Sequence, residues 1–272
     1  MRILVTGASG FVGKHFVASA LKSGHEVIGL SRQLRDHDLG ISWVKGTLGT
    51  LSEKDFQGCD SLVHFAGVGV SPAERDWQVC FHHNVEGLLS MLQVAQHTGV
   101  EKILICGSCF EYGKSGERYK FIPVDAPLEP VDAYSASKAA ATIAASTFCR
   151  DSGAKLAVLR PFHIYGEGEK EGRFWPSLMK AGRDGADFPM TLGEQVRDFM
   201  NVREVANYFL NYLTSINIEP GVPRIENIGS GIPQTLLEFA QKCWSSIGAS
   251  GRLLPGSIPY RRDEVFRYVP KI

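Results

Sequence analysis

The chain has 272 residues, 44% of them apolar and 21% charged, and its acidic and basic side chains are equal in number. A neutral chain of this length can bury a large core, and it lacks the basic stripe typical of nucleic-acid binding. No apolar run reaches the ~18 residues that a membrane span needs. The first expected strand begins at Arg2, which leaves no room for a signal peptide. We therefore expect a cytoplasmic protein that binds neither nucleic acid nor a membrane.

The cysteines lack the C-x-x-C spacing of zinc sites and redox motifs, and several lie in apolar runs. We expect reduced thiols and no metal site. The six are Cys59, Cys80, Cys106, Cys109, Cys149 and Cys243.

A glycine-rich turn near the start of the chain lies between an apolar run at 3–5, an expected strand, and an amphipathic run at 16–21, an expected helix. Strand, glycine turn and helix in this order are typical of dinucleotide binding. The first glycine permits the sharp turn, the second admits a pyrophosphate, and the third lets the helix pack closely on the sheet. The cofactor contacts predicted here are Gly7, Gly10, Phe11, Val12 and Gly13.

The next expected strand, 25–30, ends at Ser31 and Arg32, where NAD-binding proteins carry an acidic residue for the adenosine ribose. A guanidinium and a hydroxyl suit a 2′-phosphate instead. This favours NADP(H) as the cofactor. NAD(H) stays open, with Arg32 as an ordinary surface residue.

Further strands are expected at 41–44, 61–65 and 102–106, and helices lie between them. This alternation predicts an α/β fold with a doubly wound parallel sheet, in which ligands gather at the carboxyl ends of the strands. His64, inside an apolar strand, is expected to be buried and hydrogen-bonded. The cofactor contacts predicted at strand ends and in the loop beneath the adenine are Leu48, Phe65, Ala66 and Gly67.

Tyr134 and Lys138 lie four residues apart in an alanine-rich stretch expected to be helical to about Arg150, so their side chains share one helix face. A nearby ammonium lowers the pKa of a phenol, which suits it to proton exchange between a hydroxyl and a ketone. Ser108, at the end of the strand 102–106, could hydrogen-bond the same oxygen. A Y-x-x-x-K pair alone is often a solvated helix face, but the glycine turn and Ser108 favour catalysis.

These motifs resemble those of the extended short-chain dehydrogenase/reductases, specifically the NAD-dependent epimerase/dehydratase group that acts on nucleotide sugars. The resemblance covers nearly the whole chain and implies a Rossmann sheet with a smaller C-terminal substrate-binding lobe. The matching motifs are T-G-A-S-G-F-V-G at 6–13, N-V-E-G at 84–87, Ser108 five residues before Gly113, Tyr134 with Lys138, R-P-F-H-I-Y-G at 160–166, R-D-F at 197–199 and N-I-G-S-G at 227–231.

The resemblance implies a role for each matching residue. Ser108, Tyr134 and Lys138 would be catalytic. Tyr134 and Lys138 would also contact the cofactor, Lys138 at the nicotinamide ribose. Pro161 and His163 would reach the nicotinamide, and Ser108 and His163 the sugar. The implied diphosphate contacts are Arg197 and Arg261, the latter in a late arginine motif at 260–264.

The resemblance also implies a domain division and an assembly. Residues 1–160 would bind the dinucleotide, with segments at about 195–230 returning to that domain, and 161–272 would mainly form the substrate lobe. Short helices are expected to begin at about 174 and 235. A homodimer would pack through helices near 84–98 and 134–150. Related enzymes usually continue for another helix, so we expect either a shortened chain or a lobe without it.

Two departures from the family pattern bear on the reaction. Sugar dehydratases of this group carry Asp-Glu after the catalytic residue, whereas this chain has Cys109 and Phe110. Without those carboxylates 4,6-dehydration has no obvious proton donor. His163 stands where the family usually has Asn, which resembles 4-ketoreductases of the CDP-abequose synthase type more than 4-epimerases; an ordinary structural histidine is the alternative.

Our leading hypothesis is an NADP(H)-dependent oxidoreductase that reduces the C4 ketone of a nucleotide-linked 4-keto-6-deoxyhexose. Tyr134 would protonate the new alkoxide, Ser108 would orient the carbonyl and Lys138 would adjust the pKa of Tyr134. The alternative is a nucleotide-sugar 4-epimerase with bound NAD. A non-catalytic dinucleotide sensor is a more distant one, since a sensor can dispense with the Tyr134–Lys138 pair.

Overall fold

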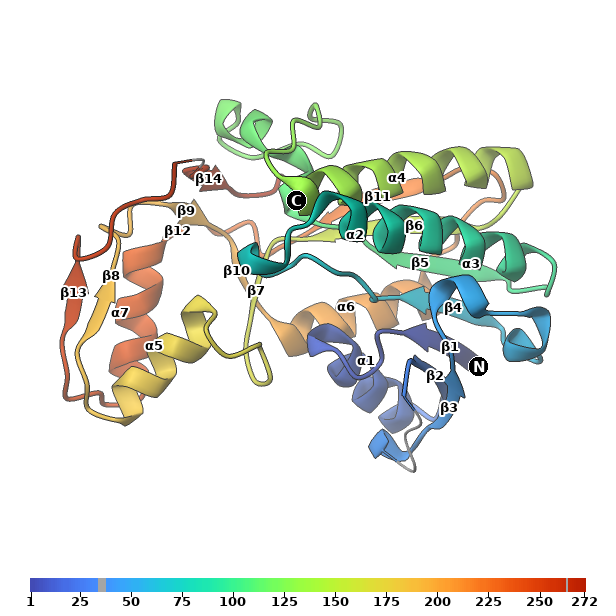
Figure 1. The fold of residues 1–272 in the computed structure, drawn as a ribbon, viewed down its shortest axis with the longest axis horizontal. Helices are drawn as coiled ribbons and strands as arrows, with labels where there is room; N and C mark the ends of the chain where they lie inside the picture. Colours follow the sequence, from blue (N-terminus) through green and yellow to red (C-terminus); the bar gives the residue numbers. More distant parts are fainter. Residues whose placement is uncertain (34–37, 263) are drawn as a thin grey trace.

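A parallel seven-stranded sheet forms the centre of the larger lobe in the computed structural model, which describes residues 1–33, 38–262 and 264–272 (Figure 1). The strand order is β11-β6-β5-β4-β1-β2-β3, so the chain winds outward in both directions from β1 and β4. The strands are β1 (Arg2–Thr6), β2 (Glu26–Ser31), β3 (Ser42–Lys45), β4 (Ser61–His64), β5 (Lys102–Cys106), β6 (Leu156–Pro161) and β11 (Arg224–Ile228).

Helices cover both faces of this sheet, which confirms the expected doubly wound α/β fold. One apolar core lies beneath α1 and α6, and a second beneath α3 and α4. The buried strands read as continuous apolar runs because both of their faces are covered. The helices of this lobe are α1 (Phe11–Lys22), α2 (Trp77–Phe81), α3 (Gly87–Gln96), α4 (Ala133–Ser152) and α6 (Val202–Ser215).

The helix expected around Asn84 begins earlier than the sequence pattern suggested. Asp76 caps α2, its carboxylate accepting a hydrogen bond from the N–H of Val79 at 2.9 Å. A π-helical turn, His82–Glu86, then joins α2 to α3. The Asp76 cap is a signal that the sequence carries and that the expected boundary missed.

The smaller lobe is made of short strands and two helices that lie beyond the carboxyl edge of the large sheet (Figure 1). β7 pairs with β10, β9 lies between β12 and β14, and β8 pairs with β13. Its elements are β7 (His163–Tyr165), α5 (Phe174–Arg183), β8 (Phe188–Met190), β9 (Val196–Arg197), β10 (Phe199–Asn201), β12 (Gln234–Thr235), α7 (Leu236–Ser246), β13 (Leu253–Pro255) and β14 (Arg267–Tyr268).

Over the described residues, no helix combines the length and the apolar character required to cross a bilayer.

Close contacts with neighbouring backbone atoms at Gly7 and Gly13 fix the turn between β1 and α1. Gly7 has φ +70°, and a Cβ there would lie 2.6 Å from the amide nitrogen of Ala66. A Cβ on Gly13 would lie 2.0 Å from the carbonyl oxygen of Gly7. Because backbone atoms cannot move aside as a flexible side chain can, both positions require glycine.

We expect Gly13→Ala to lower the free energy of unfolding by at least about 1–3 kcal/mol, because the added methyl group overlaps the Gly7 carbonyl. Urea denaturation followed by circular dichroism measures this loss. Gly49→Ala is the matched control, since Gly49 is exposed and a Cβ added there would meet no atom within 4 Å. Equal stability of the two variants would contradict this account of the turn.

His64 is fully buried at the end of β4, as the sequence predicts, and its Nδ1 lies 2.7 Å from the Thr6 hydroxyl at the end of β1. Burial, with a smaller contribution from the charge of Lys138, lowers the pKa of His64 to about 3. The folded protein therefore keeps this imidazole neutral over a pH range in which the unfolded chain protonates it.

The sign of the resulting pH dependence follows from proton binding. Between about pH 6.5 and pH 3 the unfolded state binds a proton at His64 that the folded state does not. Acidification over this range therefore lowers the free energy of unfolding by up to about 1.4 kcal/mol per pH unit because of His64. We expect His64→Gln to lose stability less steeply than the parent chain from pH 7 to pH 5. Urea unfolding at several pH values tests this, and parallel slopes would argue against a buried neutral His64.

Candidate active site

The β1–α1 turn forms a cradle that suits a dinucleotide pyrophosphate. Gly10 is the N-cap of α1, and its N–H donates to the Gly7 carbonyl at 2.9 Å. No side-chain cap and no acidic residue occupies the first turn of α1. The helix N-terminus therefore presents unclaimed N–H groups and a positive dipole end at a position where a side chain on Gly10 would crowd a ligand. Phe11 and Val12 follow directly in α1.

The other predicted cofactor residues lie at the same carboxyl edge of the sheet. Ser31 ends β2, and Arg32 follows it on the surface. Leu48 lies 3.2 Å from the position of a Cβ on Gly87. Phe65 packs its ring between Phe16 and Phe209, at centroid distances of 5.3 and 4.8 Å, so any cofactor contact from Phe65 would involve its backbone. Ala66 and Gly67 continue this segment past the end of β4.

Ser108, Tyr134 and Lys138 come together where β5 ends beside the start of α4. Asp132 caps α4 by accepting a hydrogen bond from the N–H of Ser135 at 2.9 Å, which places Tyr134 in the first turn. The Ser108 hydroxyl lies close enough to the Tyr134 phenol to oppose part of the rise in the pKa of that phenol. Lys138, one turn further on, donates from Nζ to the carbonyl of Cys106 at 2.7 Å. The structure thus assembles the three side chains that the sequence predicts to act together.

The pKa of Tyr134 is raised, whereas the spacing of Tyr134 and Lys138 in the sequence predicts that the ammonium lowers it. Burial of the phenol is the largest cause of the raised pKa, the nearby Cys106 adds to it, and the nearby Ser108 hydroxyl only partly opposes it. Lys138 directs its ammonium to the Cys106 carbonyl. In this structure Tyr134 is therefore a neutral phenol, ready to donate a proton and poorly suited to accept one.

A buried polar network, which was not predicted from the sequence, fixes the backbone of Ser108. Glu111 accepts a hydrogen bond from the N–H of Ser108 at 2.8 Å, and its other oxygen accepts from Nε of Arg160 at 2.8 Å. Arg160 also donates to the Tyr112 hydroxyl at 2.9 Å, and that hydroxyl donates to Asn227 at 2.7 Å. The S-x-x-E capping-box spacing of Ser108 and Glu111 is the signal that could have revealed it.

His163 lies in an aromatic cage and is neutral. Its ring has edge contacts with Phe110 and Phe199, at centroid distances of 5.5 and 6.0 Å, and packs against Tyr268. Burial, aided by the charges of Arg197 and Arg173, holds the pKa of His163 well below its usual range. Its Nδ1 atom is buried with no hydrogen-bond partner in the described part of the chain. Pro161 ends the neighbouring β6.

The two arginines predicted to contact a diphosphate have different surroundings. Arg197 is buried, forms an ion pair with Glu264 at 2.9 Å, and donates to the Val265 carbonyl at 2.6 Å. Its neighbour Asp198 accepts hydrogen bonds from the segment 230–231, so the two residues of the R-D-F motif do not pair with each other. Arg261 is exposed, and Asp263 of the late arginine motif lies outside the described residues.

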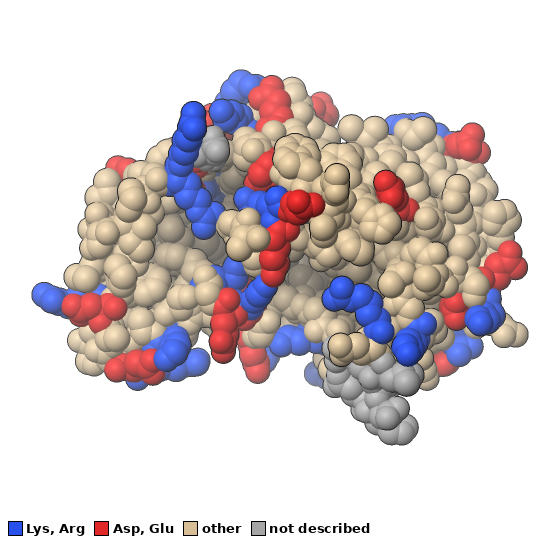
Figure 2. Space-filling view, viewed as in Figure 1, with Lys and Arg blue, Asp and Glu red and all other residues tan. Residues whose placement is uncertain are grey.

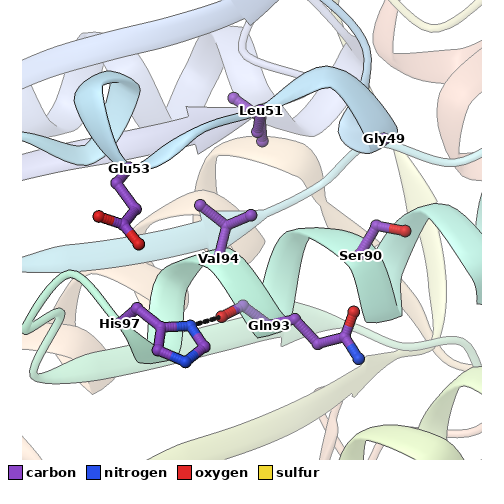
Figure 3. A pocket seen from close by; sticks show the side chains of 7 residues that line it. All are labelled: Gly49, Leu51, Glu53, Ser90, Gln93, Val94 and His97. Carbon is purple, nitrogen blue, oxygen red and sulfur yellow. Dashed lines mark hydrogen bonds between the residues drawn. The ribbon is translucent and has the colours of Figure 1, made fainter.

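A surface groove lies apart from this site, and the site contains no group of metal ligands among the described residues. A groove of about 360 Å³ lies between α3 and the segment 48–56 and shares no residue with the candidate active site (Figure 3). Within 1–33, 38–262 and 264–272, no three His, Cys, Asp or Glu side chains are grouped as metal ligands. The groove is lined by Gly49, Leu51, Glu53, Ser90, Gln93, Val94 and His97.

Comparison with known proteins identifies relatives of similar sequence and fold. UDP-glucose 4-epimerase from Neisseria meningitidis serogroup C is 28% identical over 302 residues, which cover 96% of this chain and 86% of that protein. The structure of MoeE5 with UDP-glucuronic acid and NAD has a TM-score of 0.87 at 24% identity. The match covers 100% of this chain and 90% of the MoeE5 chain. The dTDP-glucose 4,6-dehydratase DesIV from Streptomyces venezuelae, solved with NAD bound, has a TM-score of 0.82 at 25% identity, with 100% of this chain and 88% of that chain covered.

The model of the NAD dependent epimerase/dehydratase family matches residues 3–229, which include the glycine cradle, Ser108, Tyr134 and Lys138. The chain belongs to the NAD dependent epimerase/dehydratase family and is an enzyme of the short-chain dehydrogenase/reductase type.

Proposed function

We propose that this enzyme is a nucleotide-sugar 4-epimerase that acts on a UDP-linked sugar with NAD bound. The observation that carries the proposal is the convergence of Ser108, Tyr134 and Lys138 beside the glycine cradle. The UDP-glucose 4-epimerase from Neisseria, which aligns with 96% of the chain, supports this substrate class. The proposal replaces ketone reduction, our leading hypothesis from the sequence, with the alternative.

The proposed chemistry at the sugar is a proton exchange on the C4 oxygen. Nicotinamide, when bound, supplies hydride transfer at the sugar carbon. Tyr134 holds or releases the proton of the C4 oxygen, and Ser108, which lies beside Tyr134, orients that oxygen. Because Tyr134 starts as a neutral phenol, removal of the hydroxyl proton requires Lys138 or the bound ligands to stabilise the phenolate.

The glycine cradle fits the pyrophosphate of either nicotinamide dinucleotide, and the family description and the NAD-bound dehydratase from Streptomyces favour NAD. The described segment 31–33 carries no carboxylate, and Arg32 is exposed. Because of this observation we retain a second candidate function, an NADP(H)-dependent 4-ketoreductase in which Ser31 and Arg32 bind the 2′-phosphate.

We do not propose 4,6-dehydration. At the positions after Ser108, Cys109 is 2% exposed, and Phe110 is packed in edge contact with Tyr134, His163 and Tyr268. Burial raises the pKa of the Cys109 thiol, so it stays protonated. Neither side chain can replace the carboxylic acid that water elimination needs.

The remaining contacts of the site are part of the same proposal. Arg197 and Arg261 would bind the diphosphate. For Arg197 this requires that the guanidinium either leaves Glu264 or contacts Glu264 and the diphosphate at the same time. A homodimer packed through 84–98 and 134–150 belongs to the same proposal, and Ile143, which is 60% exposed on α4, would be covered in it. The larger lobe would hold the dinucleotide, and the smaller lobe the sugar.

The two candidate functions differ in net redox change. We expect the purified enzyme to retain NAD and to interconvert UDP-glucose and UDP-galactose without net consumption of the cofactor. Analysis of the released dinucleotide by mass spectrometry, together with chromatography of the UDP-sugars, measures both properties. NADPH consumption with a 4-keto-6-deoxy nucleotide sugar, and no epimerisation, would instead establish the reductase.

Replacing the phenol tests whether the protein is a catalyst or a sensor. Tyr134→Phe should lower kcat by about 10²–10⁴-fold, because the acid–base group is lost, and should leave NAD affinity within about threefold. Steady-state kinetics and a dinucleotide titration measure the two effects. Tyr119→Phe is the control, as Tyr119 is partly buried and packs against the apolar cluster that includes Phe162, away from the three catalytic side chains in sequence. Full turnover by Tyr134→Phe would exclude the proposed mechanism.

A further inference from the structure

The loop of residues 166–173 between β7 and α5, here called the strap, crosses the carboxyl edge of the large sheet. Its first half lies against α1 and α6. The carbonyl of Glu167 lies 2.8 Å from Nε2 of His15, and the Glu167 carboxylate pairs with Arg203 at 2.8 Å. Gly168, with φ +82°, lies so close to Lys14 that a Cβ there would overlap its ammonium.

The second half of the strap is fastened to the segment that follows β4. Lys170 forms an ion pair with Glu74, and Arg173 donates to the Val70 carbonyl at 3.3 Å. Charged side chains cross the middle of this face between two hollows (Figure 2). The strap therefore spans from the helix of the glycine cradle to the loop beside the catalytic tyrosine.

The Val70 anchor places the strap near the reacting groups. A Cβ on the preceding residue, Gly69, would lie 3.5 Å from Cβ of Tyr134. Arg173 also lies near enough to His163 to contribute to the lowering of its pKa. The end of the strap that carries Arg173 therefore lies beside the candidate site.

Glu169, in the centre of the strap, has an oxygen without a partner. Its side chain is 9% exposed, and Oε1 lies 3.5 Å from Nε of Arg173. Oε2 is buried and has no hydrogen-bond partner among residues 1–33, 38–262 and 264–272. Burial raises the pKa of Glu169 to about 7, against the opposing effect of Arg173. A buried carboxylate oxygen without a donor is unfavourable, so such a group points to a donor that arrives with a ligand.

We propose that Oε2 of Glu169 accepts a hydrogen bond from an O–H or N–H group of the ligand bound under the strap. The donor is either a hydroxyl of the sugar or a group on the nicotinamide half of the dinucleotide. This inference rests on the proposed function for the ligand class. It makes Glu169 a binding residue in addition to those predicted from the sequence.

The test compares Glu169→Gln and Glu169→Ala with Glu171→Gln, a matched control that removes an exposed carboxylate from the same strap. Isothermal titration of the full chain with NAD⁺, UDP, UDP-glucose and UDP-galactose gives the affinities. At about pH 8, where Glu169 is mostly ionised, we expect both Glu169 variants to bind one ligand class about 10–100-fold more weakly, because a charged acceptor is lost, and Glu171→Gln to match the parent chain.

The pattern across ligands identifies the donor. Weaker binding of the UDP-sugars with unchanged binding of UDP places the donor on the sugar, and weaker binding of NAD⁺ alone places it on the nicotinamide half. The proposal is overturned if every affinity stays within twofold, if UDP is weakened equally, or if the parent chain binds neither NAD⁺ nor a UDP-sugar. A parent chain that binds these ligands but does not interconvert the UDP-sugars refutes the proposed function, while the affinities still decide the role of Glu169.

Discussion

The buried ion pair between Glu111 and Arg160 is the interaction on which the candidate site depends. It joins the segment after β5, which carries Ser108, to the end of β6, which leads to His163. Both side chains are almost fully buried, so loss of either partner would leave an uncompensated charge in the core. The pair therefore sets the spacing between Ser108 and the segment 161–163 with little freedom for either to shift.

Much of the larger lobe could be predicted from the sequence. The apolar strands, the glycine turn and the Tyr134–Lys138 spacing are local patterns, and the parallel topology brings their strand ends to one edge. The meeting of Ser108 and Tyr134 followed from that rule. The pairing of Glu111 with Arg160 did not, because the two residues are 49 positions apart and only the folded chain brings them together.

The position of the strap and the surroundings of Arg197 and Arg261 could not be predicted from the sequence, for another physical reason. Residues 166–173 have no periodic pattern, and their positions depend on contacts with α1, α6 and the segment 70–74, which are distant in the chain. The direction of the Tyr134 pKa shift was misjudged for a related reason. Spacing shows that Lys138 is near Tyr134, but it does not show that burial dominates the pKa of Tyr134 or that the ammonium is directed to a carbonyl.

The aromatic ring of Phe110 has a consequence for how reactions diverge within this family. The Phe110 ring packs edge-on to Tyr134, His163 and Tyr268 at centroid distances of 5.5–6.4 Å. The neighbouring Cys109 lies in the buried apolar cluster against which Phe110 packs. A carboxylate introduced in place of Phe110 would lose its hydrating water among aromatic rings. Conversion of this scaffold into one that eliminates water would therefore require the whole aromatic cluster to be rebuilt around the new acid, so a simple exchange of two side chains would not suffice.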